Sequence, residues 1–297
     1  MKKSYWALLL ITIFSALLLT ACGGGGETIT VASKDFTEQF IIGEMYALLL
    51  EDAGYTVERK MNLGGTPVAH QALLDGEIDV YPEYTGTGLL TVLKHEVMSD
   101  PEAVYNTVKE DYAEQFNLAW LEPAPMNNTQ ALAMKKTRAA ELGISTFSQL
   151  VAQADQLVLI GPPEFAERED GLPGMRELYG DFEFAEFKAV DPGLRYPAIL
   201  NDEADVVVAF GTDGEIAAYD LVGLNDDKGL YPPYQVAPVI RQEVLDANPE
   251  IAEVLNKVAP LLTNETMQSL NNEVSGNGRE PADVAKEFLV AQGLISE

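Results

Sequence analysis

The chain has little of the residue types that build disulfides and transition-metal sites. Its 297 residues include one cysteine, Cys22, and two histidines, His70 and His95. A single cysteine excludes an internal disulfide, and two isolated histidines leave no set of His and Cys ligands at metal-site spacing. Basic residues are also scarce, since 19 lysines and arginines face 47 aspartates and glutamates, for a net charge of −28. This charge argues against a nucleic acid as partner, because nucleic acids bind basic surfaces.

Signatures of common enzymes are absent as well. The sequence has no Gly-x-Ser-x-Gly elbow, no phosphate loop ending in Gly-Lys-Ser or Gly-Lys-Thr, and no His-Glu-x-x-His helix. We therefore expect a binding protein rather than an enzyme, with no catalytic residue, metal or cofactor. A secreted hydrolase that uses paired carboxylates stays open as an alternative, because 47 acids can always supply such a pair.

One long apolar run is present, over residues 6–19, and it follows two lysines near the start of the chain. It is shorter than the roughly 20 residues of a membrane-spanning helix. With the small residues before Cys22, it is typical of a signal peptide over residues 1–21. Residues 19–22 resemble the bacterial lipobox, whose cysteine carries a lipid, and residues 22–27 form a Gly-rich tether. We expect an extracytoplasmic protein anchored by lipid at Cys22 to the cell membrane, on its periplasmic side or at the outer cell surface.

A short strand followed by a Gly-rich turn occurs twice in the sequence. The first copy, residues 77–88, has its strand at residues 78–81 and carries Tyr84 in the turn. The second copy, residues 203–214, lies at an offset of 126 positions (203 − 77) and places Phe210 opposite Tyr84. Two similar lobes that each offer an aromatic ring to a shared cleft explain this repeat. Because Gly-rich turns also look alike by chance, the repeat alone leaves both explanations open.

The order of the expected elements favours an α/β fold. Short β-branched runs predict strands at residues 28–32, 55–61 and 78–81. Helices are expected between them, one after a capping box formed by Asp35 and Glu38 and one with Thr66 as its N-cap. Strand–helix–strand order predicts a parallel, doubly wound sheet, whose ligands bind at the carboxyl ends of the strands. Lys34 lies at such an end.

Two cations are candidates for binding a carboxylate. Lys34 lies where a strand passes into the start of a helix, and Arg168 can bind a carboxylate through two parallel hydrogen bonds. For Lys34 the alternative is a solvated surface side chain. For Arg168 it is a plain surface ion pair with one of four acidic neighbours, Glu164, Glu167, Glu169 and Asp170. Aromatic rings at strand ends supply the opposite chemistry, since their faces attract quaternary ammonium groups.

Two further segments are interpreted as crossings between lobes. Residues 126–130 interrupt the strand pattern after two prolines, and residues 231–234 form a stiff Tyr-Pro-Pro-Tyr loop. The crossings divide the chain into lobe 1, residues 28–127 and 235–297, and lobe 2, residues 128–234.

Several motifs in order resemble the substrate-binding proteins of glycine betaine/carnitine/choline ABC transporters. They cover nearly all of the chain after the signal peptide and lie at residues 33–39, 63–68, 81–88, 168–171, 212–214 and 227–234. The resemblance implies the type II periplasmic-binding-protein fold, with two doubly wound lobes joined by two crossover strands. It also implies that the partners are a quaternary amine and an ABC permease with its ATPase. The binding protein itself is expected to be a monomer.

The same resemblance assigns ligand-binding roles. Tyrosines of that family surround a trimethylammonium group, and Tyr84 and Tyr234 match two of them. Lysine, arginine and threonine of the family hold the ligand carboxylate, and Lys34, Thr87 and Arg168 match these.

Two positions depart from the family pattern, because Gln130 and Phe210 stand where tyrosines are common. Phe210 keeps a ring face and Gln130 does not. The ligand therefore stays open between glycine betaine, choline or carnitine and another amine or a larger betaine such as ergothioneine. Tyr196 or Tyr231 would compensate if either lay nearby. A lipoprotein for adhesion that binds no small ligand is the third alternative.

Overall fold

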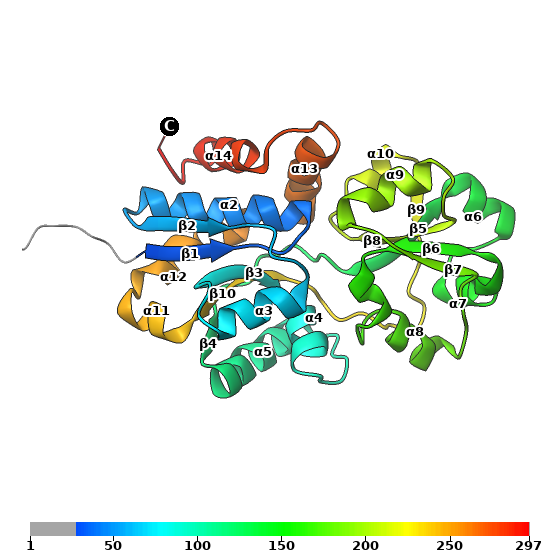
Figure 1. Cartoon of the computed structure of the whole chain (residues 1–297), viewed down its shortest axis with the longest axis horizontal. Coiled ribbons are helices and arrows are strands. Elements are labelled where there is room, and N and C mark those ends of the chain that lie inside the picture. Colours follow the sequence, from blue (N-terminus) through cyan, green and yellow to red (C-terminus); the bar gives the residue numbers. More distant parts are fainter. Residues whose placement is uncertain (1–27, 297) are drawn as a thin grey trace, which may run out of the picture.

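The computed structural model describes residues 28–296, so the expected signal peptide, tether and lipidated Cys22 lie outside the described residues. Figure 1 shows two α/β halves side by side along the long axis of the molecule, with each sheet flanked by helices. Each half is built on a five-stranded sheet. Within residues 28–296, no helix combines the length and the apolar character needed to cross a bilayer.

The first sheet has the order β2-β1-β3-β10-β4. Its strands are β1 (Thr28–Ala32), β2 (Thr56–Lys60), β3 (Val80–Tyr84), β4 (Leu118–Trp120) and β10 (Val236–Arg241). Strands β1, β2 and β3 are parallel, whereas β10 runs antiparallel to both of its neighbours. The sheet is thus mixed rather than purely parallel as predicted, because β10 enters it from the other half of the molecule.

The second sheet repeats this arrangement with the order β7-β6-β8-β5-β9. Its strands are β5 (Gln130–Lys135), β6 (Val158–Gly161), β7 (Glu186–Ala189), β8 (Val206–Phe210) and β9 (Leu221–Gly223). Here β5 is the antiparallel strand, and it too arrives from the opposite half. The two sheets therefore have one topology, with β3 and β8 at equivalent positions.

Helices cover both sheets. They are α2 (Thr37–Asp52), α3 (Thr66–Leu74), α4 (Thr85–Thr87), α5 (Pro101–Phe116), α6 (Lys136–Leu142), α7 (Phe147–Val151), α8 (Leu172–Tyr179), α9 (Arg195–Leu200), α10 (Glu215–Ala218), α11 (Gln242–Ala247), α12 (Glu250–Asn256), α13 (Asn264–Ser275) and α14 (Pro281–Ala291). Shorter turns of 3₁₀ or π type are η1 (Gly88–Val92), η2 (Ala154–Gln156), η3 (Pro163–Ala166), η4 (Pro192–Leu194) and η5 (Ala259–Leu261). Helices α12, α13 and α14 pack on α2, which explains why α2 is buried around most of its circumference.

Strand β3 begins and ends later than predicted, at Val80–Tyr84 rather than residues 78–81, and includes Pro82. Pro82 lies opposite Pro238 of β10, and the Pro238 carbonyl accepts a hydrogen bond from Leu121 N, away from β3. The two prolines thus form a non-hydrogen-bonded pair, in which neither missing N–H is needed between the strands. Tyr84 becomes the last residue of the strand.

The two predicted crossing segments lie against each other. Asn128 N donates to the Tyr234 carbonyl at 3.0 Å, and Tyr234 N donates to Asn127 Oδ1 at 2.8 Å. These bonds hold the start of β5 beside the segment that leads into β10. The site residues on both segments are fixed relative to each other by this pairing.

Candidate functional site

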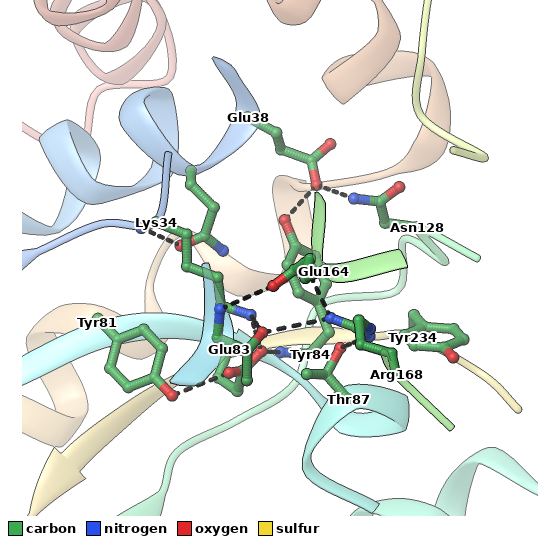
Figure 2. A network of polar contacts seen from close by, with 12 residues as sticks. Lys34, Glu38, Tyr81, Glu83, Tyr84, Thr87, Asn128, Glu164, Arg168 and Tyr234 are labelled. Atoms are coloured by element: carbon green, nitrogen blue, oxygen red, sulfur yellow. Dashed lines mark hydrogen bonds and ion pairs between the residues drawn. The ribbon is translucent and has the colours of Figure 1, made fainter. Parts of the chain in front are cut away.

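A small cavity between the two sheets brings together all seven residues predicted to bind ligand. It is lined by Lys34, Phe36, Tyr84, Thr87, Asn128, Gln130, Glu164, Arg168, Phe210 and Tyr234. Figure 2 shows most of these side chains in one polar network. The cavity volume is about 30 Å³. This is room for only about two water molecules.

Lys34 is 2% exposed, so it is not the solvated surface lysine that was the alternative interpretation. Its Nζ lies 2.5 Å from Glu83 Oε1 and donates to Thr66 Oγ1 at 2.9 Å. Glu83 is itself fully buried and also accepts from the Tyr81 hydroxyl and from Tyr84 N. The Lys34 charge is therefore already balanced inside the protein.

Arg168 forms the bidentate carboxylate contact that its chemistry favours, but with Asp170. Its Nε and one terminal nitrogen donate to the two Asp170 carboxylate oxygens at 2.7 and 2.6 Å. The Tyr234 hydroxyl donates to the same carboxylate at 2.5 Å. Burial alone favours the protonated acid, but Arg168 and Tyr234 hold the pKa of the Asp170 carboxyl below its usual value.

Glu164 reaches from the second half of the molecule to the start of helix α3 in the first. Its carboxylate accepts from Thr66 N at 3.3 Å and from Arg168 at 3.2 Å. A Cβ atom on Gly65 would lie 2.3 Å from Glu164 Oε2, so glycine makes this approach possible. An anion thus already lies at the helix N-terminus, where free N–H groups favour negative charge. Sequence reasoning treated Glu164 only as an acidic neighbour of Arg168.

Aromatic rings form a continuous layer beside these charges. The Phe36 ring stacks against Tyr84 and against Phe210, each at 6.2 Å between centroids. Phe36 lies in the motif at residues 33–39, but the sequence did not assign it to the site. Because it links the ring at the end of β3 to the ring at the end of β8, it completes the layer that the repeat predicted.

Glu38 has a different role from the predicted capping box. Helix α2 begins after Phe36, and no side chain caps it. Glu38 is instead buried beside the cavity, where its carboxylate accepts from the Tyr84 hydroxyl and from Asn128 Nδ2, each at 2.7 Å. The predicted N-cap Thr66 is likewise the first helical residue of α3, which leaves its hydroxyl free to accept from Lys34.

Comparison with known proteins now identifies the family. A profile described as the substrate-binding domain of an ABC-type glycine betaine transport system matches residues 27–291. The chain belongs to this family. A solved structure of a glycine betaine/carnitine/choline ABC transporter protein has a TM-score of 0.71 at 31% identity, and it covers 90% of this chain and 100% of its own. The fold predicted from the motifs is therefore confirmed.

Family members named as binding proteins include the carnitine transport binding protein OpuCC of Listeria monocytogenes. It is 34% identical over 299 residues, with 97% of each chain covered. The ergothioneine transport permease/ergothioneine binding protein EgtU of Helicobacter pylori is 37% identical over 269 residues, which is 90% of this chain. The chain spans about half of that relative, 48% of its length. These family members are transport proteins, which favours a binding protein over a hydrolase.

Within the family pattern, the two departing positions face each other. Gln130 of β5 lies in register with Phe210 of β8, and both line the cavity. Neither Tyr196 nor Tyr231 replaces the ring missing at Gln130, because neither lines this cavity. Tyr231 packs against Phe147 and Tyr234, and the Tyr196 hydroxyl donates to Asp213.

Proposed function

We propose that the protein is the extracytoplasmic, lipid-anchored binding component of an ABC importer and captures a quaternary-ammonium compatible solute between two lobes. The observation that carries this proposal is a cavity in which a layer of rings meets charged hydrogen-bonding groups. Ring faces at Phe36, Tyr84, Phe210 and Tyr234 attract a trimethylammonium group, each by roughly 0.5–2 kcal/mol. Such a group donates no hydrogen bond, so rings are its natural partners.

The charged end of the cavity supports a zwitterionic ligand of the glycine betaine or carnitine type. When Glu164 withdraws, the N–H groups at the start of α3 and the Arg168 guanidinium become available to another carboxylate. The Thr87 hydroxyl is 3.4 Å from Arg168 and can donate to the same group. Because Glu83 and Asp170 already balance Lys34 and Arg168, hydroxyl and backbone donors carry a large share of that contact.

The lobe assignment supports a closure mechanism. We take residues 28–127 and 235–297 as lobe 1 and residues 128–234 as lobe 2, with the two crossing segments as hinge. Contacts from Glu164 and Arg168 to Thr66 span the lobes, so a ligand between them would stabilise the closed form. The permease and its ATPase would recognise that form.

A larger betaine such as ergothioneine is the second candidate. It is favoured by the amide of Gln130 in place of a ring, and by the name of the Helicobacter pylori relative.

Isothermal titration of the protein lacking residues 1–21 tests the substrate class. The ligands are glycine betaine, proline betaine, carnitine, choline and ergothioneine, and the variant is Thr87→Val, which keeps volume and removes the hydroxyl. We expect at least one trimethylammonium compound to bind, and Thr87→Val to weaken glycine betaine about tenfold more than choline. That ratio corresponds to one hydrogen bond to a charged group.

The exposed Thr56→Val on β2 is the matched control and should change neither affinity. If none of the five ligands binds, the proposed substrate class is wrong. If Thr87→Val weakens glycine betaine and choline equally, only the carboxylate-binding role of Thr87 is wrong.

The lipid anchor has its own test. Because Cys22 is the only cysteine, Cys22→Ser removes any thioether-linked lipid without disturbing a disulfide. We expect the variant to move from the membrane fraction to the soluble fraction of fractionated cells. Equal membrane retention of both forms would contradict anchoring at Cys22.

A further inference from the structure

A second chamber lies beside the ligand cavity. It is lined by Phe36, Thr37, Glu38, Asn128, Pro192, Gly193, Arg195, Tyr196, Pro197, Phe210, Thr212, Asp213, Glu215, Tyr219, Asn271 and Ser275. Its volume is about 90 Å³. At roughly 10–15 Å³ for each water, this is room for about six water molecules or for one small polar group.

The chamber and the ligand cavity share a wall. Phe36, Asn128 and Phe210 line both spaces. Behind them, Glu38 accepts from Tyr84 of the ligand cavity and from Asn128. Figure 2 shows Glu38 and Asn128 together, set apart from the cluster around Lys34 and Arg168. The second polar space therefore adjoins the ligand cavity at Phe36, Asn128 and Phe210.

Three hydrogen-bond acceptors in this chamber are buried without a donor from the described part of the chain. They are Asn128 Oδ1, Asn271 Oδ1 and Glu215 Oε2, on side chains only 5%, 4% and 8% exposed. The amide orientations are fixed because Asn128 and Asn271 donate their Nδ2 groups to the Glu38 carboxylate. Buried acceptors without donors are unfavourable, so the chamber suits a guest that donates hydrogen bonds.

The charged side chains that line this chamber limit which chemical groups it can bind. Asp213 is already engaged by Arg195 at 2.7 Å and by the Tyr196 hydroxyl at 2.6 Å. In the described part of the chain Glu215 forms no such ion pair, so the chamber keeps an acidic character. Two donors are left there without a partner in the described chain, the Nε–H of Arg195 and the Thr212 hydroxyl. A head group with several N–H donors and a positive or neutral charge matches this arrangement, and a trimethylammonium group does not.

We propose that this chamber is a second subsite, which binds an N–H-bearing head group of imidazole, guanidinium or primary amine type at the far end of a betaine. The trimethylammonium end of the same solute lies against the rings of the ligand cavity. The inference rests on the proposed function, because it assumes a solute anchored there. It makes Glu215, Asn128 and Asn271 the residues that distinguish a larger betaine from glycine betaine.

Titration with two probes tests the subsite. Glycine betaine carries only the trimethylammonium and carboxylate groups, whereas histidine betaine adds an imidazole with an N–H donor. We expect histidine betaine to bind at least tenfold more tightly to the natural protein, and Glu215→Gln to reduce that ratio about tenfold. The exposed Glu110→Gln on α5 is the matched control and should keep the ratio.

The outcomes separate the subsite from the function. If glycine betaine binds as tightly as histidine betaine to the natural protein, the subsite is overturned and the function stands. The same conclusion follows if Glu215→Gln folds and keeps the full ratio. If neither probe nor any other quaternary amine binds, the subsite and the proposed function both fail. The comparison of the two probes on the natural protein holds even if the variant does not fold.

Discussion

Glu38 is a buried acid held entirely by neutral partners. It is 3% exposed, and its carboxylate accepts from Tyr84, Asn128 and Asn271. Burial is the largest influence and raises the pKa of the Glu38 carboxyl above its usual value, although the hydrogen bonds from Tyr84 and Asn271 oppose the change. The folded protein therefore holds the Glu38 proton more tightly than the unfolded chain does.

This shift gives a pH dependence with a defined sign. The contribution of Glu38 to the free energy of unfolding is fully present below the ordinary glutamate pKa of about 4.3. It is lost as the pH rises through the raised pKa of the folded state. We expect Glu38→Gln to remove this decline, so that its free energy of unfolding falls less between about pH 4.5 and neutrality. Urea unfolding at several pH values measures it. An identical slope for Glu38→Gln and the natural protein would contradict the assignment.

Residue patterns located the site but not its internal pairings. All seven residues predicted to bind ligand line one cavity, and their contact with a ligand stays a prediction. The motifs did not show that Glu83 balances Lys34, because that contact joins a loop after β1 to the middle of β3. Nor did they show Glu164 or Asn128, whose polar side chains look like surface residues until the two halves are brought together.

At the scale of elements, the repeat at an offset of 126 positions corresponds to two real strands. Strand β3 (Val80–Tyr84) and strand β8 (Val206–Phe210) occupy the same position in their sheets and end at the two aligned rings. The strand predicted at residues 78–81 begins two positions and ends three positions before the observed strand, Val80–Tyr84. The turns that follow are equivalent in sequence, but the first becomes α4 and η1 while the second meets α13.

Gly86 in α4 tests how tightly this turn is packed. A Cβ atom there would lie 2.8 Å from the Tyr234 ring and 2.9 Å from the Pro233 carbonyl oxygen. We expect Gly86→Ala to displace Tyr234 and to destabilise the fold by about 1–3 kcal/mol. Thermal unfolding and ligand titration measure the two effects.

Gly223→Ala at the end of β9 is the control, since no atom lies within 4 Å of the added carbon. If both variants behave alike, close approach is not the reason for glycine at position 86.

For the whole molecule, the fold class was accessible from the order of motifs and strands. The antiparallel strands β5 and β10 were not, because a strand pattern carries no direction and each of these enters its sheet from the opposite half. The sequence also could not predict that the two halves of the molecule contact each other. It depends on side chains such as Glu164 that cross from one sheet to the start of a helix on the other.

The Glu164 side chain places an internal anion of the protein at the start of α3. A solute carboxylate bound at the start of α3 would take the place of the Glu164 carboxylate, and Glu164 would return when the solute leaves. On the proposed function, the returning Glu164 carboxylate would satisfy these N–H groups as the solute leaves, and its displacement would lower the affinity for an incoming solute.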